Sequence, residues 1–129
     1  MHSFKIVSAI ALLLIVLVGA GIYTQSTLSS TAQHLESQIA EVERNTIAED
    51  WDKAGNSLER VEKDWGKTEK TWTTLIDHTE IDNIDYTLSK LSKYVETESK
   101  SLALAEIAAL KKYIQHIPEK ESFLLKNIF

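Results

Sequence analysis

An uninterrupted apolar stretch near the N-terminus, residues 4–23, constrains this chain more than any other feature. From Ile6 to Ile22 there are 17 residues without a charged side chain. As an α-helix they rise about 26 Å, which nearly spans the roughly 30 Å hydrocarbon core of a bilayer. Phe4 and Tyr23 extend the stretch at its two ends, and aromatic residues favour the membrane–water interface. We therefore expect residues 1–25 to be a transmembrane anchor that contacts the membrane through residues 4–23.

The charges that flank this stretch predict its orientation. Lys5 is the only charged residue before it, and the 12 residues after Tyr23 contain no Lys, Arg, Asp or Glu. The positive-inside rule then places the N-terminus in the cytoplasm and residues 26–129 outside a cell membrane that the chain crosses once. A cleaved signal peptide is the alternative, because the small residues 18–20 form an acceptable cleavage site after an apolar core. Both alternatives export residues 26–129.

Composition limits the function classes open to the exported part. Because Lys5 is the only charged residue of the anchor, the exported part holds 13 basic and 19 acidic residues, a net charge of −6. An acidic domain binds nucleic acid poorly, so we expect no nucleic-acid partner. The absence of cysteine excludes a disulfide scaffold, a thiolate metal site and a cysteine nucleophile. One proline and four glycines in 129 residues indicate helix throughout.

Apolar residues recur at helical spacing along most of the exported part. A first amphipathic helix is predicted from Leu28 to Thr46, and Asp50 can cap the next one. The second helix has the clearest pattern, because large residues alternate at spacings of three and four. Such a seam packs against a neighbouring helix at a shallow angle, and we interpret it as core rather than as an aromatic ligand surface. The structural seam comprises Trp51, Leu58, Val61, Trp65, Trp72 and Leu75.

Two further helices complete the predicted fold. Thr79 resembles the cap of a third helix from about Glu80 to Val95, and Ser101 can cap a fourth. Pro118 is expected to stop the fourth helix, because proline lacks the amide donor that an interior position needs. The prediction is an all-α fold, with an N-terminal transmembrane helix followed by an antiparallel bundle of about four amphipathic helices. The apolar C-terminal tail should pack on the bundle, bind a partner or contact the bilayer.

Helix direction is expected to bring two histidines to one end of this bundle. The second and fourth helices should both end on the side of the anchor, so that His78 and His116 lie there among carboxylates. Helix capping is our preferred interpretation of both histidines, because a histidine at a helix C-terminus can bond the last carbonyls. A partner-docking surface and a divalent metal site remain alternatives. The candidate interaction pole comprises Asp77, His78, Glu80, Asp82, Asn83, His116, Glu119 and Phe129.

No motif carries a strong signal for catalysis. The pole supplies paired acids, but the sequence offers no nucleophile, no set of oxyanion donors and no glycine-rich phosphate loop to accompany them. We therefore expect a protein that is not an enzyme and that has no cofactor and no metal.

Two segments together with the C-terminal residues carry a resemblance to a known family. The segments read LIDHTEIDNI at residues 75–84 and HIPE at residues 116–119, and the chain ends in NIF. This pattern, which follows Trp72 and lies behind one N-terminal span, resembles a family of short, uncharacterised single-span membrane proteins of Gram-positive, often spore-forming, bacteria. That family is described only as a domain of unknown function. The resemblance implies a mostly helical protein and a membrane partner, and it implies no activity.

Three hypotheses about function follow. The leading one is a non-enzymatic membrane-anchored protein whose acidic helical ectodomain is an interaction or accessory module for another envelope protein. The second is a small-molecule or metal-sensing ectodomain that works through a partner. The third is a structural envelope component. A seam with spacings of three and four can also join two chains, so a homodimer is possible.

Overall fold

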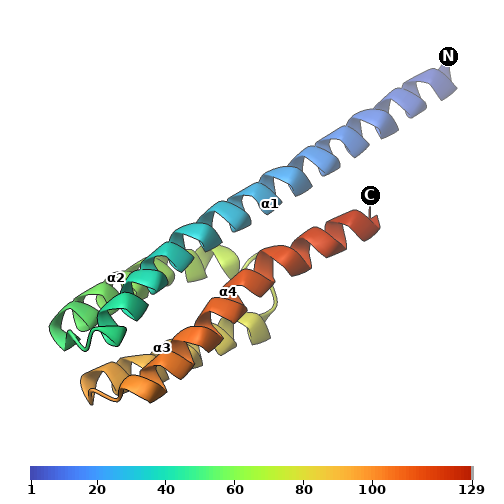
Figure 1. Cartoon of the computed structure of the whole chain (residues 1–129). Coiled ribbons are helices and arrows are strands. Elements are labelled where there is room, and N and C mark those ends of the chain that lie inside the picture. Colours follow the sequence, from blue (N-terminus) through green and yellow to red (C-terminus); the bar gives the residue numbers. More distant parts are fainter. Residues whose placement is uncertain (129) are drawn as a thin grey trace.

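The chain folds into four α-helices, which confirms the predicted all-α class. The computed structural model describes the backbone of residues 1–128 and the side chains of residues 1–120. The helices are α1 (His2–Ile47), α2 (Trp51–Trp72), α3 (His78–Glu96) and α4 (Lys100–Ile128), and no strand occurs within the described backbone (Figure 1).

Helix α1 joins the expected anchor and the first amphipathic helix into one element. Its 46 residues correspond to a length of about 69 Å, and residues 24–31 continue the helix out of the apolar stretch. The apolar side chains before Tyr23 lie exposed, and α1 is the helix long and apolar enough to cross a membrane. The other half of α1 has one buried face that begins at Leu28. The helix therefore has two different environments along its length.

The buried half of α1 forms an antiparallel four-helix bundle with α2, α3 and α4 (Figure 1). Helix α1 packs against α2 and α4, and α3 completes the ring by packing against α4 and, over a smaller interface, α2. The core follows the predicted stripes of the first, third and fourth amphipathic helices, except that Ile47, a possible last member of the first stripe, is exposed. From α1 the buried residues are Leu28, Ala32, Leu35, Ile39 and Val42; from α3, Ile81, Ile84, Leu88, Leu91 and Val95; from α4, Ala103, Ile107, Leu110, Ile114 and Ile117.

The α2 seam is buried over most of its length, and Trp65 and Trp72 lie in its C-terminal half. Their rings meet edge to face, with centroids 5.6 Å apart and planes at 82°, a geometry that aromatic pairs favour. Trp51 is only partly buried against the core. Leu75 was wrongly assigned to the seam, because α2 ends at Trp72 and Leu75 is 40% exposed in the turn that follows.

The turn between α2 and α3 has a local cause and corrects the predicted position of His78. The hydroxyls of Thr73 and Thr74 donate hydrogen bonds to the carbonyls of Lys70 and Thr71, an alternative to helix propagation that threonine offers. Asp77, not Thr79, then caps α3, since its carboxylate accepts a hydrogen bond from the Thr79 amide. His78 consequently begins α3 instead of ending α2.

The other two turns share one backbone design. Glu49 between α1 and α2 and Glu98 between α3 and α4 both have φ 56°, the left-handed conformation that commonly ends a helix. In each case the next residue's amide reaches a carbonyl five residues earlier, Asp50 to Asn45 and Ser99 to Tyr94. The predicted cap at Asp50 is confirmed, because its carboxylate accepts from the Lys53 amide.

Helix α4 departs from the prediction at both ends. It begins at Lys100, one residue before the expected cap at Ser101, and it passes through Pro118 as far as Ile128. Proline has no amide hydrogen, so the Ile114 carbonyl lacks the hydrogen bond that residue 118 would otherwise donate to it. The helix continues despite this loss. The Pro118 carbonyl is itself bonded by the Gln25 side chain of α1, with Nε2 and O 3.1 Å apart. His116 therefore lies inside α4 and does not end it.

Candidate interaction site at the anchor side of the bundle

Glu80 and two α4 side chains form the charged part of the site. Glu80 lies in the first turn of α3, and its side chain is only 15% exposed. Lys120 Nζ lies 3.4 Å and His116 Nε2 lies 3.9 Å from Glu80 Oε1. His116 and Lys120 are one turn apart on α4 and so lie on the same face. The structure thus brings Glu80 and His116 together, and Lys120, which the sequence reasoning missed, is the nearer cation.

The remaining residues of the predicted pole do not converge on this cluster. The Asp77 carboxylate caps α3. His78, Asp82 and Glu119 are exposed. The Asn83 carbonyl accepts a hydrogen bond from the Thr87 hydroxyl within α3. Phe129 lies outside the described residues. Among the side chains that the structure describes, no group of three or more His, Asp or Glu residues is arranged to hold a metal ion.

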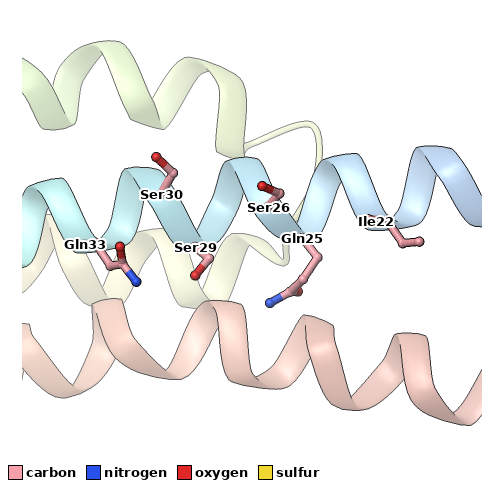
Figure 2. Close-up of a pocket in the computed structure, with 6 residues that line it drawn as sticks. All are labelled: Ile22, Gln25, Ser26, Ser29, Ser30 and Gln33. Atoms are coloured by element: carbon pink, nitrogen blue, oxygen red, sulfur yellow. The ribbon is translucent and has the colours of Figure 1, made fainter.

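A second, uncharged part of the site lies on α1 where the helix leaves its apolar stretch. Its side chains line a shallow groove of about 450 Å³. Figure 2 shows Ser26 and Ser30 on the side of α1 toward α2, and Gln25 and Ser29 on the side toward α4. Gln25 Nε2 donates a hydrogen bond to the Pro118 carbonyl, whereas the buried Oε1 of Gln25 has no protein partner. The lining residues are Ile22, Gln25, Ser26, Ser29, Ser30 and Gln33.

The sequence reasoning treated this part of α1 only as a link or a continuing helix. The signal that could have identified it is compositional: residues 24–33 carry no charge and are rich in hydroxyl groups, in a chain of which 26% of residues are charged. Ser26, Ser30 and Gln33 are exposed. Small hydroxylated residues at one helix face allow a second helix to approach closely. The groove is therefore a surface on which another helix can pack.

An acidic groove between α2 and α3 is the second polar feature of the bundle. The Trp65 indole donates a hydrogen bond of 2.7 Å to Asp85 at the base of this groove. The pKa of the Glu69 carboxyl is raised, first by its hydrogen bond with Asp85 and then by burial and the neighbouring negative charge. Burial, followed by repulsion from Glu59, also raises the pKa of Glu62. These carboxyls hold protons more tightly than isolated ones do.

Polar pairs between helices fix the remaining faces of the bundle. The Gln38 amide donates to Asp64 at 2.7 Å, which together with His34 holds the pKa of that carboxyl below its usual value despite partial desolvation. Lys111 of α4 lies 2.8 Å from Glu43 of α1. These pairs are made within the fold, and among their atoms the buried Oε1 of Gln38 has no protein partner.

Comparison with known proteins gives one match. Residues 22–128 match the family described as "Domain of unknown function (DUF4363)". No curated protein and no solved structure matches the chain. The matched range covers the bundle in full and starts just before Tyr23, where the apolar stretch ends.

Proposed function

The chain belongs to the DUF4363 family, and from that premise and the bundle's surface we propose that it is a membrane-anchored, non-enzymatic accessory module for another envelope protein. The apolar part of α1 would hold it in the membrane, and the four-helix bundle would present the docking surface. The positive-inside rule supports an N-terminus in the cytoplasm and a bundle outside, because Lys5 is the one charge before the apolar stretch. The sequence resemblance described above favours the envelope of a Gram-positive bacterium.

The uncharged groove on α1 is the observation that carries this proposal. Ser26 and Gln33 lie three and ten residues beyond Tyr23, which corresponds to about 5–15 Å along the helix. That height falls within and just outside the headgroup layer, since a bilayer of about 40–45 Å includes a core of about 30 Å. A partner that packs against these serines is therefore itself attached to the membrane. Its docking element would be a helix that leaves the bilayer beside α1.

The charged cluster of Glu80, His116 and Lys120 supports a docking surface at the same end of the bundle as the groove. His116 is 58% exposed although it lies near Glu80, so it can donate to a partner's acceptor without breaking the closer Lys120–Glu80 pair. Helix α4 packs on both α1 and α3. A helix docked on α1 could therefore also contact the charged cluster, which would form a polar rim beside the groove. Hydrophobic or small central contacts with a polar rim are typical of protein interfaces.

Site-specific photo-crosslinking in native membranes tests the proposal. A photoreactive amino acid at Ser30 of the full-length protein is expected to give one dominant adduct, identified as a membrane protein by mass spectrometry. Gln115 on α4 is the matched control. It is uncharged and exposed, and it lies at a similar height, because Pro118 is paired with Gln25 on the antiparallel helix. The same probe at Gln115 should give no such adduct.

Three outcomes would contradict the accessory role. Equal labelling at Ser30 and Gln115, or none at either, would remove the groove as a docking surface. An adduct of twice the chain's mass would show that the groove joins two copies of this protein. A second variant, Ser26→Trp, fills the groove and should abolish the Ser30 adduct while leaving the helical circular dichroism unchanged.

A further inference from the structure

Helix α4 extends beyond the bundle toward the apolar part of α1. The backbone is helical for ten residues after Pro118, and in Figure 1 this end of α4 points the same way as the N-terminal, apolar part of α1. Two contacts set the relative height of these antiparallel helices: the hydrogen bond from Gln25 to the Pro118 carbonyl and the pair of Lys111 with Glu43. At about 1.5 Å per residue, both contacts are satisfied when Pro118 lies about level with Ser29. Each further residue of α4 then lies about level with an α1 residue one position closer to the N-terminus.

This register sets the depth of the C-terminal turns. Leu124 lies about level with Tyr23, the residue that ends the apolar stretch, and Ile128 lies about level with Gly19 when both helices rise about 1.5 Å per residue. The end of α4 thus reaches about 6 Å inside the boundary that Tyr23 marks. If α1 crosses a bilayer, α4 cannot stay in water to its end without bending away.

The sequence of α4 changes character at this height. Up to Ile117 its buried residues form one stripe, with charged and polar residues on the other faces. The charges Glu119, Lys120 and Glu121 then come together just outside the level of Tyr23, and the segment after them reads SFLLKNI. Phe123, Leu124 and Leu125 are consecutive apolar residues, which is not the spacing of three and four that a single buried stripe requires. A sequence without such a stripe suits lipid better than a single protein groove.

The one charge in this segment is compatible with a shallow position. Lys126 lies about level with Gly21, two residues or about 3 Å inside the boundary at Tyr23. Lysine can extend its long side chain to the interface while its methylene groups stay in an apolar layer. Segments that lie at the boundary of headgroups and acyl chains are typically buried by about 5–10 Å.

We propose that residues 124–128 enter the membrane leaflet on the side of the bundle and form a second membrane contact beside α1. The occupant of this apolar surface is the lipid bilayer, not a second copy or a soluble protein. With two helices entering the same leaflet, the bundle is held to the membrane at α1 and at α4. This contact is independent of the partner proposed for the α1 groove.

Fluorescence quenching by lipids measures the depth directly. The natural chain contains no cysteine, so a single Leu124→Cys substitution can carry an environment-sensitive NBD label in the full-length protein. The protein is reconstituted into phosphatidylcholine–phosphatidylglycerol vesicles with or without lipids that carry a doxyl quencher near the headgroup. Leu17→Cys on α1 is the membrane control, and Gln115→Cys on α4, three residues before Pro118, is the water control.

The label at position 124 is expected to emit at shorter wavelength than the label at 115 and to lose at least half of its fluorescence to the quencher lipid. The label at position 17 should be quenched, and the label at 115 should not. Quenching at 124 no greater than at 115 would overturn the proposal, because the segment would then lie in water, on the bundle or against a second copy. Absence of quenching at 17 would also overturn it, since the reference level of α1 in the membrane would be lost.

Discussion

Replacing Trp72 by alanine tests whether the α2 seam holds the bundle together. Trp72 is the last residue of α2, is 1% exposed and packs edge to face against Trp65. A buried indole removes about 200–250 Å² from water, which at about 25 cal/mol/Å² corresponds to roughly 5–6 kcal/mol. A compact denatured state reduces such figures by about 10–40%. The expected loss is therefore about 4 kcal/mol, within the range of about 3–5 kcal/mol that is typical of tryptophan-to-alanine changes.

Urea unfolding of the full-length protein in a mild detergent, followed by circular dichroism at 222 nm, measures this loss. With an m value of about 2 kcal/mol/M, the midpoint should fall by about 2 M. Trp51→Ala is the matched control, because the same side chain is only partly buried at the other end of α2, and its loss should be about half as large. If Trp72→Ala cost less than Trp51→Ala, the burial argument for the seam would be refuted.

The remaining predictions concern the acidic groove, a helix cap and the proline of α4. The raised pKa of Glu69 means that the folded state binds its proton more tightly than the unfolded state. The resulting stability is fully present below the usual value of 4.5 and is lost as pH rises through the higher folded pKa. Glu69→Gln should therefore flatten the decline in urea midpoint between about pH 4.5 and 7, whereas an unchanged slope would exclude the Glu69–Asp85 pair as its source. Asp50→Ala should cost about 1 kcal/mol through loss of the cap, and Asp50→Asn should restore most of it; equal losses in the two variants would argue against capping. Pro118→Ala should raise stability by roughly 1–3 kcal/mol by restoring an amide donor inside α4, and a lower urea midpoint would show that the ring is required there.

The core could be predicted from the sequence because burial follows helical spacing. A stripe such as Ile107, Leu110 and Ile114 specifies its own buried face, and these positions are buried in the structure. The helix ends were harder, because they depend on local competition. Two threonines, Thr73 and Thr74, end α2 through side-chain hydrogen bonds to carbonyls, and the spacing of apolar residues does not reveal these bonds. Leu75 was misplaced for that reason.

The candidate site was only partly predictable, because its contacts connect residues that are far apart in the sequence. Proline usually ends a helix, but the Pro118 carbonyl is bonded by Gln25, 93 residues away, and the local rule gave the wrong end for α4. Helix direction did bring Glu80 close to His116. It gave no indication that Lys120, one turn further along α4, would lie nearer to the carboxylate.

The unbroken course of α1 has a mechanical consequence. If its apolar part crosses a bilayer, no hinge separates that part from the bundle, and the helix acts as a lever with its fulcrum at the membrane surface. The arm from Thr24 to Ile47 is about 35 Å long, so a tilt of about 10° displaces the far turn at Glu49 sideways by about 6 Å. Bilayers of different thickness change the tilt of long helices. A change in membrane thickness at one end would then become a lateral displacement of the turn at Glu49 at the other end.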